Sequence, residues 1–396
     1  MVYLLSEVFM GLYSDYINAG LDFPKLTQER KNQLKNISGL RDDRAILVYA
    51  SDYRKAQMAD ISITYEDLLP IKDQISTLTS DKIDVILETP GGFAEVAEDI
   101  VNLLRNKFNE VNFIIPGSAK SAGTIMAMSG DDILMEPSSS LGPIDAQIAW
   151  QGKRFSAEAF LKGLDKIKGE VDATGRLNKA YIPILQNISP GEIEDSQNAL
   201  DFAIELVAEW LSKYKFKNWT VHSSTGQAVT TPEKKARAKE IADFLCRHSL
   251  WHTHGRSIKI DDLHNKRLKV IDYSKDAKLC EAIQRYFTLL QMTFENTNFY
   301  KIYETPTTQI YKSVVILSPV KVAPSAVSGK AVIEFICPKC KTHSKIQANI
   351  NKPHPLEKGM HEFPKNDIFI CPNCKAENDI KSMRLELEAQ SKGKVV

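Results

Sequence analysis

Long apolar runs are missing from this 396-residue sequence, and none could cross a bilayer. The opening segment, MVYLLSEVFMGL, is apolar but short, and it lacks the basic region and small-residue cleavage site of a signal peptide. Charge of one sign is not in excess, since 51 Lys and Arg residues stand against 50 Asp and Glu residues. A membrane-spanning protein and a strongly basic nucleic-acid binder are therefore not expected. The sequence favours a soluble, cytoplasmic protein.

Cysteine is also scarce, and its placement argues against a disulfide framework. Four of the six cysteines form two Cys-x-x-Cys pairs, Cys337 with Cys340 and Cys371 with Cys374. Four thiolates can coordinate one Zn²⁺ ion tetrahedrally, whereas redox chemistry would not need two pairs. We expect a structural zinc site in a small C-terminal zinc ribbon, a module that folds only with its metal.

The rest of the chain predicts an α/β fold. Short apolar runs of strand length, such as Arg44–Ala50 and Ile83–Glu88, alternate with amphipathic helices, which favours parallel pairing. A Thr-, Pro- and Ser-rich stretch near residue 303 marks the expected boundary. We expect an N-terminal helical segment (1–40), a catalytic domain (41–302), a linker (303–330), the zinc ribbon (331–380) and a charged tail (381–396).

Two small-residue loops follow two of these strands. Gly91 and Gly92 end the second strand, and Ser121 follows the third at the start of a helix. Paired glycines allow close backbone approach, so their N–H groups could bind an oxyanion, with the Ala122 N–H as a second donor. Ser121 could then be a nucleophile, although most serines at a helix start are simple caps.

The order of motifs separates these two interpretations. Between Glu88 and Asp145 the chain contains ETPGG, PGSAKSAGT, SGDDILMEP and LGPID at tight spacing. This stretch resembles the serine dehydrogenase proteinase family, relatives of signal peptide peptidase A and the Clp protease. The resemblance implies a Clp/crotonase-type spiral of ββα units with Ser121 as nucleophile and Gly91 or Gly92 with Ala122 as oxyanion donors. The family's His before the Pro-Gly-Gly turn is Glu88 here.

The general base is harder to assign, because no histidine follows Ser121 until His222. A Clp-type triad in its usual chain order is therefore not expected. Signal peptide peptidase relatives use a Lys, and burial can depress a Lys pKa enough for it to act as a base. Lys162, in the apolar context AFLKGL, is the preferred candidate, with Lys153, Lys166 and Lys168 as alternatives and a solvated Lys as the simpler interpretation. His254 is expected to be structural or to line the site, and it is a further alternative for the base.

The leading hypothesis is an intracellular serine peptidase with a Ser121–Lys162 dyad that acts on peptide or protein substrates. The resemblance implies self-association into a homo-oligomer. The ribbon is expected to be structural or to recruit a partner protein, and nucleic acid is not expected, because few aromatics accompany its charges. One rival is a crotonase-type acyl-CoA enzyme without a serine nucleophile. The other is a catalytically degenerate scaffold whose ribbon recruits protein or nucleic acid.

Overall fold

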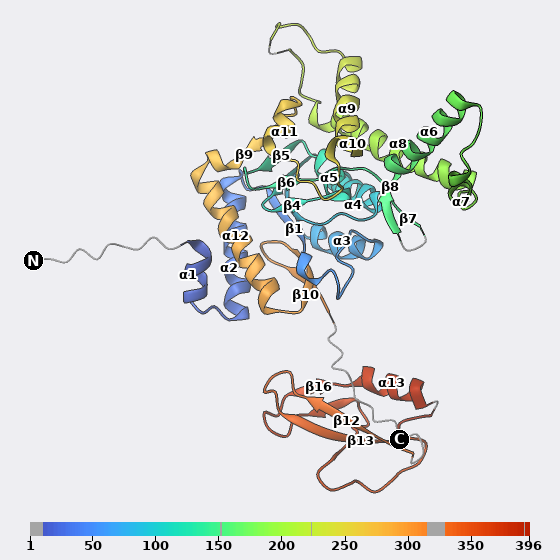
Figure 1. Ribbon diagram of the computed structural model, residues 1–396. Coiled ribbons are helices and arrows are strands. Elements are labelled where there is room, and N and C mark those ends of the chain that lie inside the picture. The colour runs from blue at the N-terminus through green and yellow to red at the C-terminus, as the bar shows by residue number, and fades with distance from the viewer. Residues whose placement is uncertain (1–10, 151–152, 223, 315–328, 392) are drawn as a thin grey trace, which may run out of the picture. The chain divides into compact units, whose positions relative to one another are not determined.

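The computed structural model describes residues 11–150, 153–222, 224–314, 329–391 and 393–396. The chain divides into two compact units, Met1–Val314 and Val315–Val396 (Figure 1). Within the described residues, no helix combines the length and the apolar character needed to span a bilayer.

The larger unit is built on a seven-stranded sheet in the order β11-β10-β1-β2-β3-β5-β9. Strands β1, β2, β3, β5 and β9 pair in parallel. Strand β10 pairs with β1 in the antiparallel direction, and β11 pairs with β10 in the same way. The strands are β1 (Ala45–Ser51), β2 (Lys82–Glu88), β3 (Glu110–Ile115), β5 (Asp132–Met135), β9 (Ile271–Asp272), β10 (Phe299–Glu304) and β11 (Gln309–Ser313). The strands predicted from apolar runs form the middle of the sheet, as expected for strands covered on both faces.

Helices cover both faces of this sheet, and successive residues of each strand enter different cores. In β1, Ile46 and Val48 pack with α2 and α12, whereas Leu47 and Tyr49 pack in the core formed with the helices of the other face. The helices that position the candidate site are α2 (Phe23–Leu40), α3 (Leu68–Ser76), α4 (Ala94–Lys107), α5 (Ala122–Met128) and α12 (Ala277–Asn296). One further helix, α1 (Leu12–Asn18), lies against α12.

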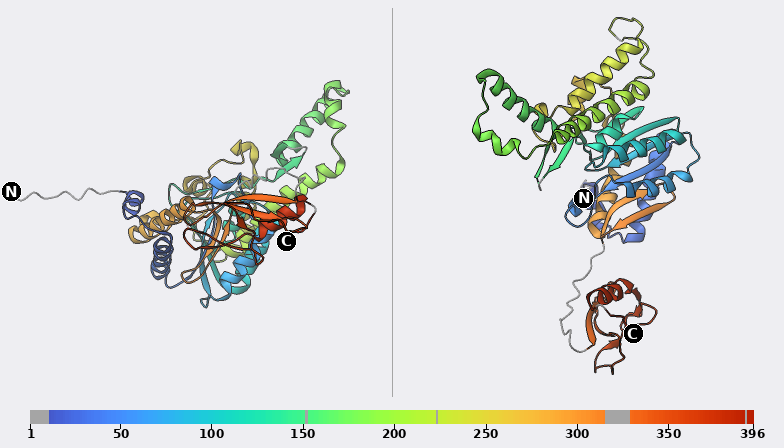
Figure 2. Two further views of the ribbon diagram at one scale, coloured as in Figure 1. Left: turned by 90° about the horizontal axis from the view of Figure 1, so that it is seen from below. Right: turned by 90° about the vertical axis from the view of Figure 1, so that its right-hand side faces the viewer.

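A largely helical region is inserted between β5 and β9 and projects from the sheet (Figure 2). It begins with the hairpin β7 (Gln147–Trp150) and β8 (Lys153–Ser156), after the short strands β4 (Ser118–Ala119) and β6 (Ser140–Leu141) pair beside the sheet. Its helices are α6 (Ala157–Thr174), α7 (Ile182–Leu185), α8 (Pro190–Trp210), α9 (Thr231–Cys246), α10 (His248–Trp251) and α11 (Ile260–Asn265). Thr230 caps α9, with Glu233 completing a capping box.

The C-terminal unit is a small β module with one helix. Its strands are β12 (Lys330–Ile336), β13 (His343–Asn349), β14 (His361–Glu362), β15 (Ile368–Ile370) and β16 (Glu377–Asp379), followed by α13 (Lys381–Ser391). Phe335, Ile346 and Phe369 form its core.

Two boundaries expected from the sequence were wrong. Residues 303–313 were expected in a linker but form the end of β10 and strand β11, because Tyr303 is buried in the sheet and β11 pairs with β10. Residues 381–396 were expected to be a charged tail outside the ribbon, yet α13 buries Leu387 and Val395 also enters the core of the ribbon. Composition alone concealed both, since each segment contains only isolated apolar residues among polar ones.

Candidate active site

Ser121 stands in a strained backbone conformation between β4 and α5. Its φ of 50° and ψ of −119° lie in a region that residues other than glycine rarely adopt. Every residue of α5 is buried, and the Thr124 hydroxyl donates to the Ala119 carbonyl at 2.7 Å. Such strain costs about 1–3 kcal/mol and persists at functional sites where the surroundings enforce it. A sharp strand-to-helix turn of this kind can present a serine hydroxyl as a nucleophile.

The Gly91–Gly92 turn packs directly against the Ser121 loop. A Cβ atom on Gly91, whose φ is +98°, would lie 2.6 Å from Ser121 Cβ and 3.1 Å from Ala122 N. Gly92, with φ of +156°, could not accept a side chain either, because Ile63 occupies that space. The glycines therefore allow two backbone segments to meet beside Ser121.

The N–H groups at this meeting point differ in availability. The Gly91 N–H donates to Thr89 Oγ1 at 3.2 Å. Within the described residues, the N–H groups of Gly92 and Ala122 donate no hydrogen bond. The sequence predicts oxyanion donors at Gly91, Gly92 and Ala122. Gly92 and Ala122 are the better candidates, because their N–H groups are free to bind an oxyanion.

Glu88 fixes the start of the same loop. Its carboxylate accepts a hydrogen bond from the Ser118 N–H at 2.7 Å, and Gly117 leaves it room, because a Cβ there would overlap the carboxylate. Burial raises the pKa of Glu88 to about 7, against the opposing hydrogen bonds from Ser118. The residue that replaces the family's His is thus a buried structural carboxyl group.

Lys120, next to Ser121, joins three segments of the chain. Its ammonium group donates to the Leu141 carbonyl at 2.9 Å and to Ser257 Oγ at 3.1 Å. Burial and the nearby Lys259 lower its pKa to about 8. Leu141 also pairs with Ile258 through two backbone hydrogen bonds, of 2.9 and 3.0 Å. The segment around residue 257 is therefore anchored beside the Ser121 loop.

An aspartate with two histidines lies on these anchored segments. Asp145 has a fully buried side chain, and its Oδ1 lies 2.7 Å from Nδ1 of His254 while its Oδ2 lies 2.8 Å from Nδ1 of His248. Burial alone would raise the pKa of Asp145, but these two imidazoles hold it below its usual value. A carboxylate that binds Nδ1 fixes the tautomer of a histidine and leaves Nε2 free to take a proton.

The position of His254 favours it over His248 as a partner of Ser121. His254 lies just before Arg256 and Ser257, whose carbonyl and hydroxyl contact Lys120. His248 is followed by Ser249, which contacts Glu158 and Lys162 on α6 instead. His252, which could have shared a helix face with His248, follows the end of α10 with a φ of +64° and takes no part.

Lys162 does not have the environment that a lysine base needs. Its side chain is 51% exposed, forms an ion pair with Glu158 and lies 2.8 Å from the Ser249 hydroxyl. The expectation of burial failed because the apolar residues around it face the other side of an amphipathic helix. The alternatives, Lys153, Lys166 and Lys168, are exposed as well.

The Asp145–His254 pair was missed at the sequence level because its members are 109 residues apart. Asp145 ends the last motif of the resemblance, LGPID, and His254 is an alternative base at the level of sequence, but nothing there pairs the two residues. No local spacing could have joined them, since the contact depends on the return of the chain from α9 to β6.

The four ribbon cysteines converge as predicted. Their sulfur atoms all lie within 4.8 Å of one another, with Sγ of Cys337 3.6 Å from that of Cys374. The two knuckles repeat one geometry, because Lys341 and Lys375, each directly after a Cys-x-x-Cys pair, both have a φ of +58°. A tetrahedral ion with metal–sulfur bonds of about 2.3 Å places sulfurs about 3.8 Å apart, so the four residues fit one metal ion.

Comparison with known proteins agrees with this architecture. Residues 2–229 match the family of ClpP-like SDH-type serine proteinases. Two uncharacterized proteins of Methanocaldococcus jannaschii are 28% and 33% identical over 35% and 34% of this chain. The matched regions are 50% and 47% of those proteins, so this chain spans about half the length of the curated relatives it matches.

Solved structures with some similarity include two of a membrane-bound stomatin-specific protease, one of them a complex with a substrate peptide. Both have a TM-score of 0.32 and 15% identity, and they cover 55% and 64% of this chain and 79% and 83% of theirs. That similarity is too low to support an argument about activity. The family match, which covers more than half of the chain, shows that this protein belongs to the ClpP-like SDH-type serine proteinases.

Proposed function

We propose that this chain is a serine peptidase in which Ser121 is the nucleophile, His254 the general base and Asp145 the residue that orients it. The strained conformation of Ser121 against the Gly91–Gly92 turn is the observation that carries the proposal. The order Ser, Asp, His along the chain is one of several in which this geometry occurs on unrelated folds. His254 replaces Lys162, the base first expected, because Lys162 is exposed and paired with Glu158.

The proposed reaction follows from these groups. Ser121 Oγ attacks the carbonyl carbon of a peptide bond while its proton passes to Nε2 of His254. The N–H groups of Gly92 and Ala122 bind the resulting oxyanion. The intermediate collapses, the amine leaves with the proton from His254, and water then hydrolyses the acyl ester by the same route.

Labelling with a fluorophosphonate, read by intact mass, tests the nucleophile. Wild-type protein should gain one adduct that Ser121→Ala loses, whereas a crotonase-type enzyme without a serine nucleophile should gain none. His254→Ala should slow labelling strongly, and Lys162→Met, the matched control for the rejected base, should leave it within about twofold. Unlabelled wild-type protein that is folded and zinc-loaded would contradict the proposal and favour the scaffold.

The remaining predictions concern assembly and metal. We propose that the four cysteines bind one zinc ion with a structural role, supported by the convergence of their sulfurs. Metal analysis of purified protein should find one zinc per chain, and this zinc should be lost in Cys337→Ser.

Self-association remains a prediction from the family, and light scattering should give a mass above the 44.5 kDa of one chain. The ribbon is proposed to serve protein rather than nucleic-acid partners.

A further inference from the structure

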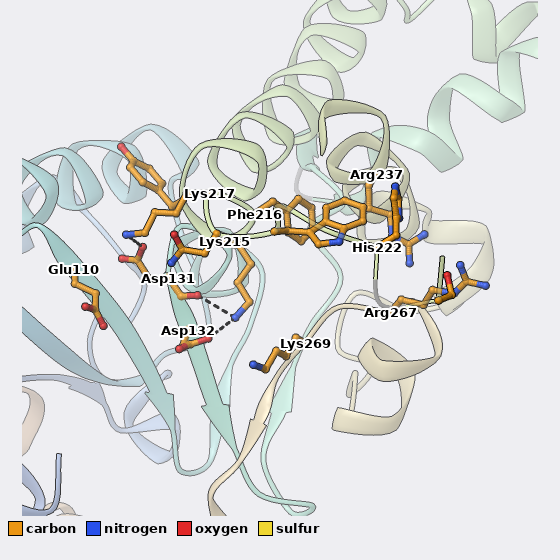
Figure 3. Close-up of a pocket in the computed structure, with 14 residues that line it drawn as sticks. Glu110, Asp131, Asp132, Lys215, Phe216, Lys217, His222, Arg237, Arg267 and Lys269 are labelled. Atoms are coloured by element: carbon orange, nitrogen blue, oxygen red, sulfur yellow. Dashed lines mark hydrogen bonds and ion pairs between the residues drawn. The ribbon is translucent and has the colours of Figure 1, made fainter. Parts of the chain in front are cut away.

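A cavity of about 720 Å³ opens where strands β3 and β5 begin (Figure 3). It is lined by Glu110 and Asp132 from the first residues of these strands, whereas the Ser121 loop follows the other end of β3. The volume lies within the range of small-molecule sites. This cavity is therefore separate from the proposed peptidase site.

Irregular backbone forms two of its walls. Helix α8 continues into a π-helix, Leu211–Lys215, which is followed by a turn that carries Phe216 and Trp219. The opposite wall is the loop after α11, where Arg267 has a φ of +53°. Both π-helical turns and residues other than glycine at positive φ are concentrated at functional sites.

Positively charged side chains outnumber negatively charged ones around the cavity. Five Lys and Arg residues and three acidic residues line it. The acidic groups are already paired: Asp131 with Arg105 at 2.7 Å, Asp132 with Lys215 at 2.8 Å, and Glu110 with Arg44 at 2.6 Å.

Two of the cations have no such partner. Among the described residues, the side chains of Lys269 and Arg267 form no hydrogen bond or ion pair. Figure 3 shows the ammonium group of Lys269 directed toward Lys215 and Asp132. Burial lowers the pKa of Lys215, and the nearby Lys269 lowers it further, against the attraction of Asp132. An anion between the two lysines would relieve their repulsion.

An aromatic surface adjoins these cations. The rings of Phe216 and Trp219 meet edge to face, with centroids 5.6 Å apart and an interplanar angle of 65°. Phe216 is buried, and Trp219 is only partly buried where it lines the cavity. A rigid, partly open indole beside cations suits a ligand that combines a planar ring with negative charge.

We propose that this cavity binds a nucleoside diphosphate or triphosphate. The phosphates lie between Lys215, Lys269 and Arg267, and the base lies against Trp219. The proposal is independent of the peptidase chemistry, because no group at Ser121 takes part and binding can be measured without catalysis.

Isothermal titration of the full-length, zinc-loaded protein with ADP, ATP and pyrophosphate tests this site. Lys269→Ala and Arg267→Gly each remove one exposed cation, and glycine accepts the positive φ of residue 267. Lys239→Ala is the matched control, since Lys239 is an exposed lysine on α9 that does not line the cavity. Trp219→Leu tests the ring, and circular dichroism verifies that each variant is folded.

The expected result is saturable binding of ADP and ATP that each cation variant weakens about tenfold or more, while Lys239→Ala leaves it unchanged. Trp219→Leu should weaken ADP but not pyrophosphate. No saturable binding at millimolar ADP would overturn the proposal, as would equal losses in Lys269→Ala and Lys239→Ala. If pyrophosphate binds as tightly as ADP and Trp219→Leu leaves the affinity for ADP unchanged, the assignment to nucleotides is overturned.

Discussion

Ser121 combines the hydroxyl proposed as nucleophile with a backbone conformation that residues other than glycine avoid. Alanine and glycine at this position both remove the hydroxyl, but only glycine tolerates φ of +50°. We expect Ser121→Gly to be more stable than Ser121→Ala by about 1 kcal/mol in urea unfolding, with neither labelled by a fluorophosphonate. Equal stabilities of the two variants would show that the strain is not present in solution.

A substitution at Asp145 tests the assignment of the base and leaves the imidazole rings of His248 and His254 in place. Asp145→Asn keeps the size of the side chain but presents an N–H to one of the two histidines, so His254 can adopt the wrong tautomer. In a serine protease such a change lowers the rate by about 10⁴-fold, and a large loss of fluorophosphonate labelling is expected here. His248→Ala is the internal control, and a larger loss in that variant than in His254→Ala would move the role of base to His248.

Glu88 should make stability depend on pH. Burial raises its pKa to about 7, so between its ordinary value near 4.5 and 7 the folded state holds a proton that the unfolded state has released. Stability from this group is therefore present below pH 4.5 and is lost as pH rises through 7.

Glu88→Gln should remove this loss of stability. At pH 8 the free energy that Glu88 costs the folded wild-type protein, and that the variant should not lose, is on the order of 3 kcal/mol. Urea unfolding at pH 5 and pH 8 measures it. Tyr53 and Lys120 face the same carboxyl group and are unchanged in the variant. The same loss between pH 5 and 8 in both proteins would assign the dependence to another group.

At the scale of elements, α2 and β10 are held together by a buried ion pair. Arg30 and Glu304 both have fully buried side chains, with Nε 2.9 Å from Oε1, and the Tyr286 hydroxyl donates to the same oxygen at 2.6 Å. Glu304→Gln leaves Arg30 charged and uncompensated, so we expect a loss of about 3–5 kcal/mol in urea unfolding. Glu281→Gln, at an exposed pair on α12, should cost less than about 1 kcal/mol.

The parallel strands and the β10–β11 hairpin show what the sequence could and could not predict. Strands buried on both faces are continuous apolar runs, so β1 and β2 could be predicted as the runs Arg44–Ala50 and Ile83–Glu88. β10 carries Lys301 and Glu304 into the core, each neutralised by a partner far along the chain. Ser121 and its glycines could be singled out because the order of the motifs around them resembles a known family, whereas the contact of Asp145 with His254 depends on the tertiary fold.

At the scale of the whole molecule, the two units should respond separately to loss of metal. The unit from residue 315 onward is small, and structural zinc supplies about 10–16 kcal/mol in domains of this kind, so removal of the ion should unfold it. The unit up to residue 314 has its own two large cores and no cysteine of the cluster.

Hydrogen exchange with and without a zinc chelator can follow both units at once. Cys337→Ser or chelation should expose the amides of β12 and β13 to exchange while β1, β2 and β3 remain protected. Labelling of Ser121 should then continue at the wild-type rate, because none of the groups proposed to activate it lies in the ribbon. A matching loss of protection around Ser121 would mean that the ribbon stabilises the peptidase unit, and the structural role of zinc would extend to the active site.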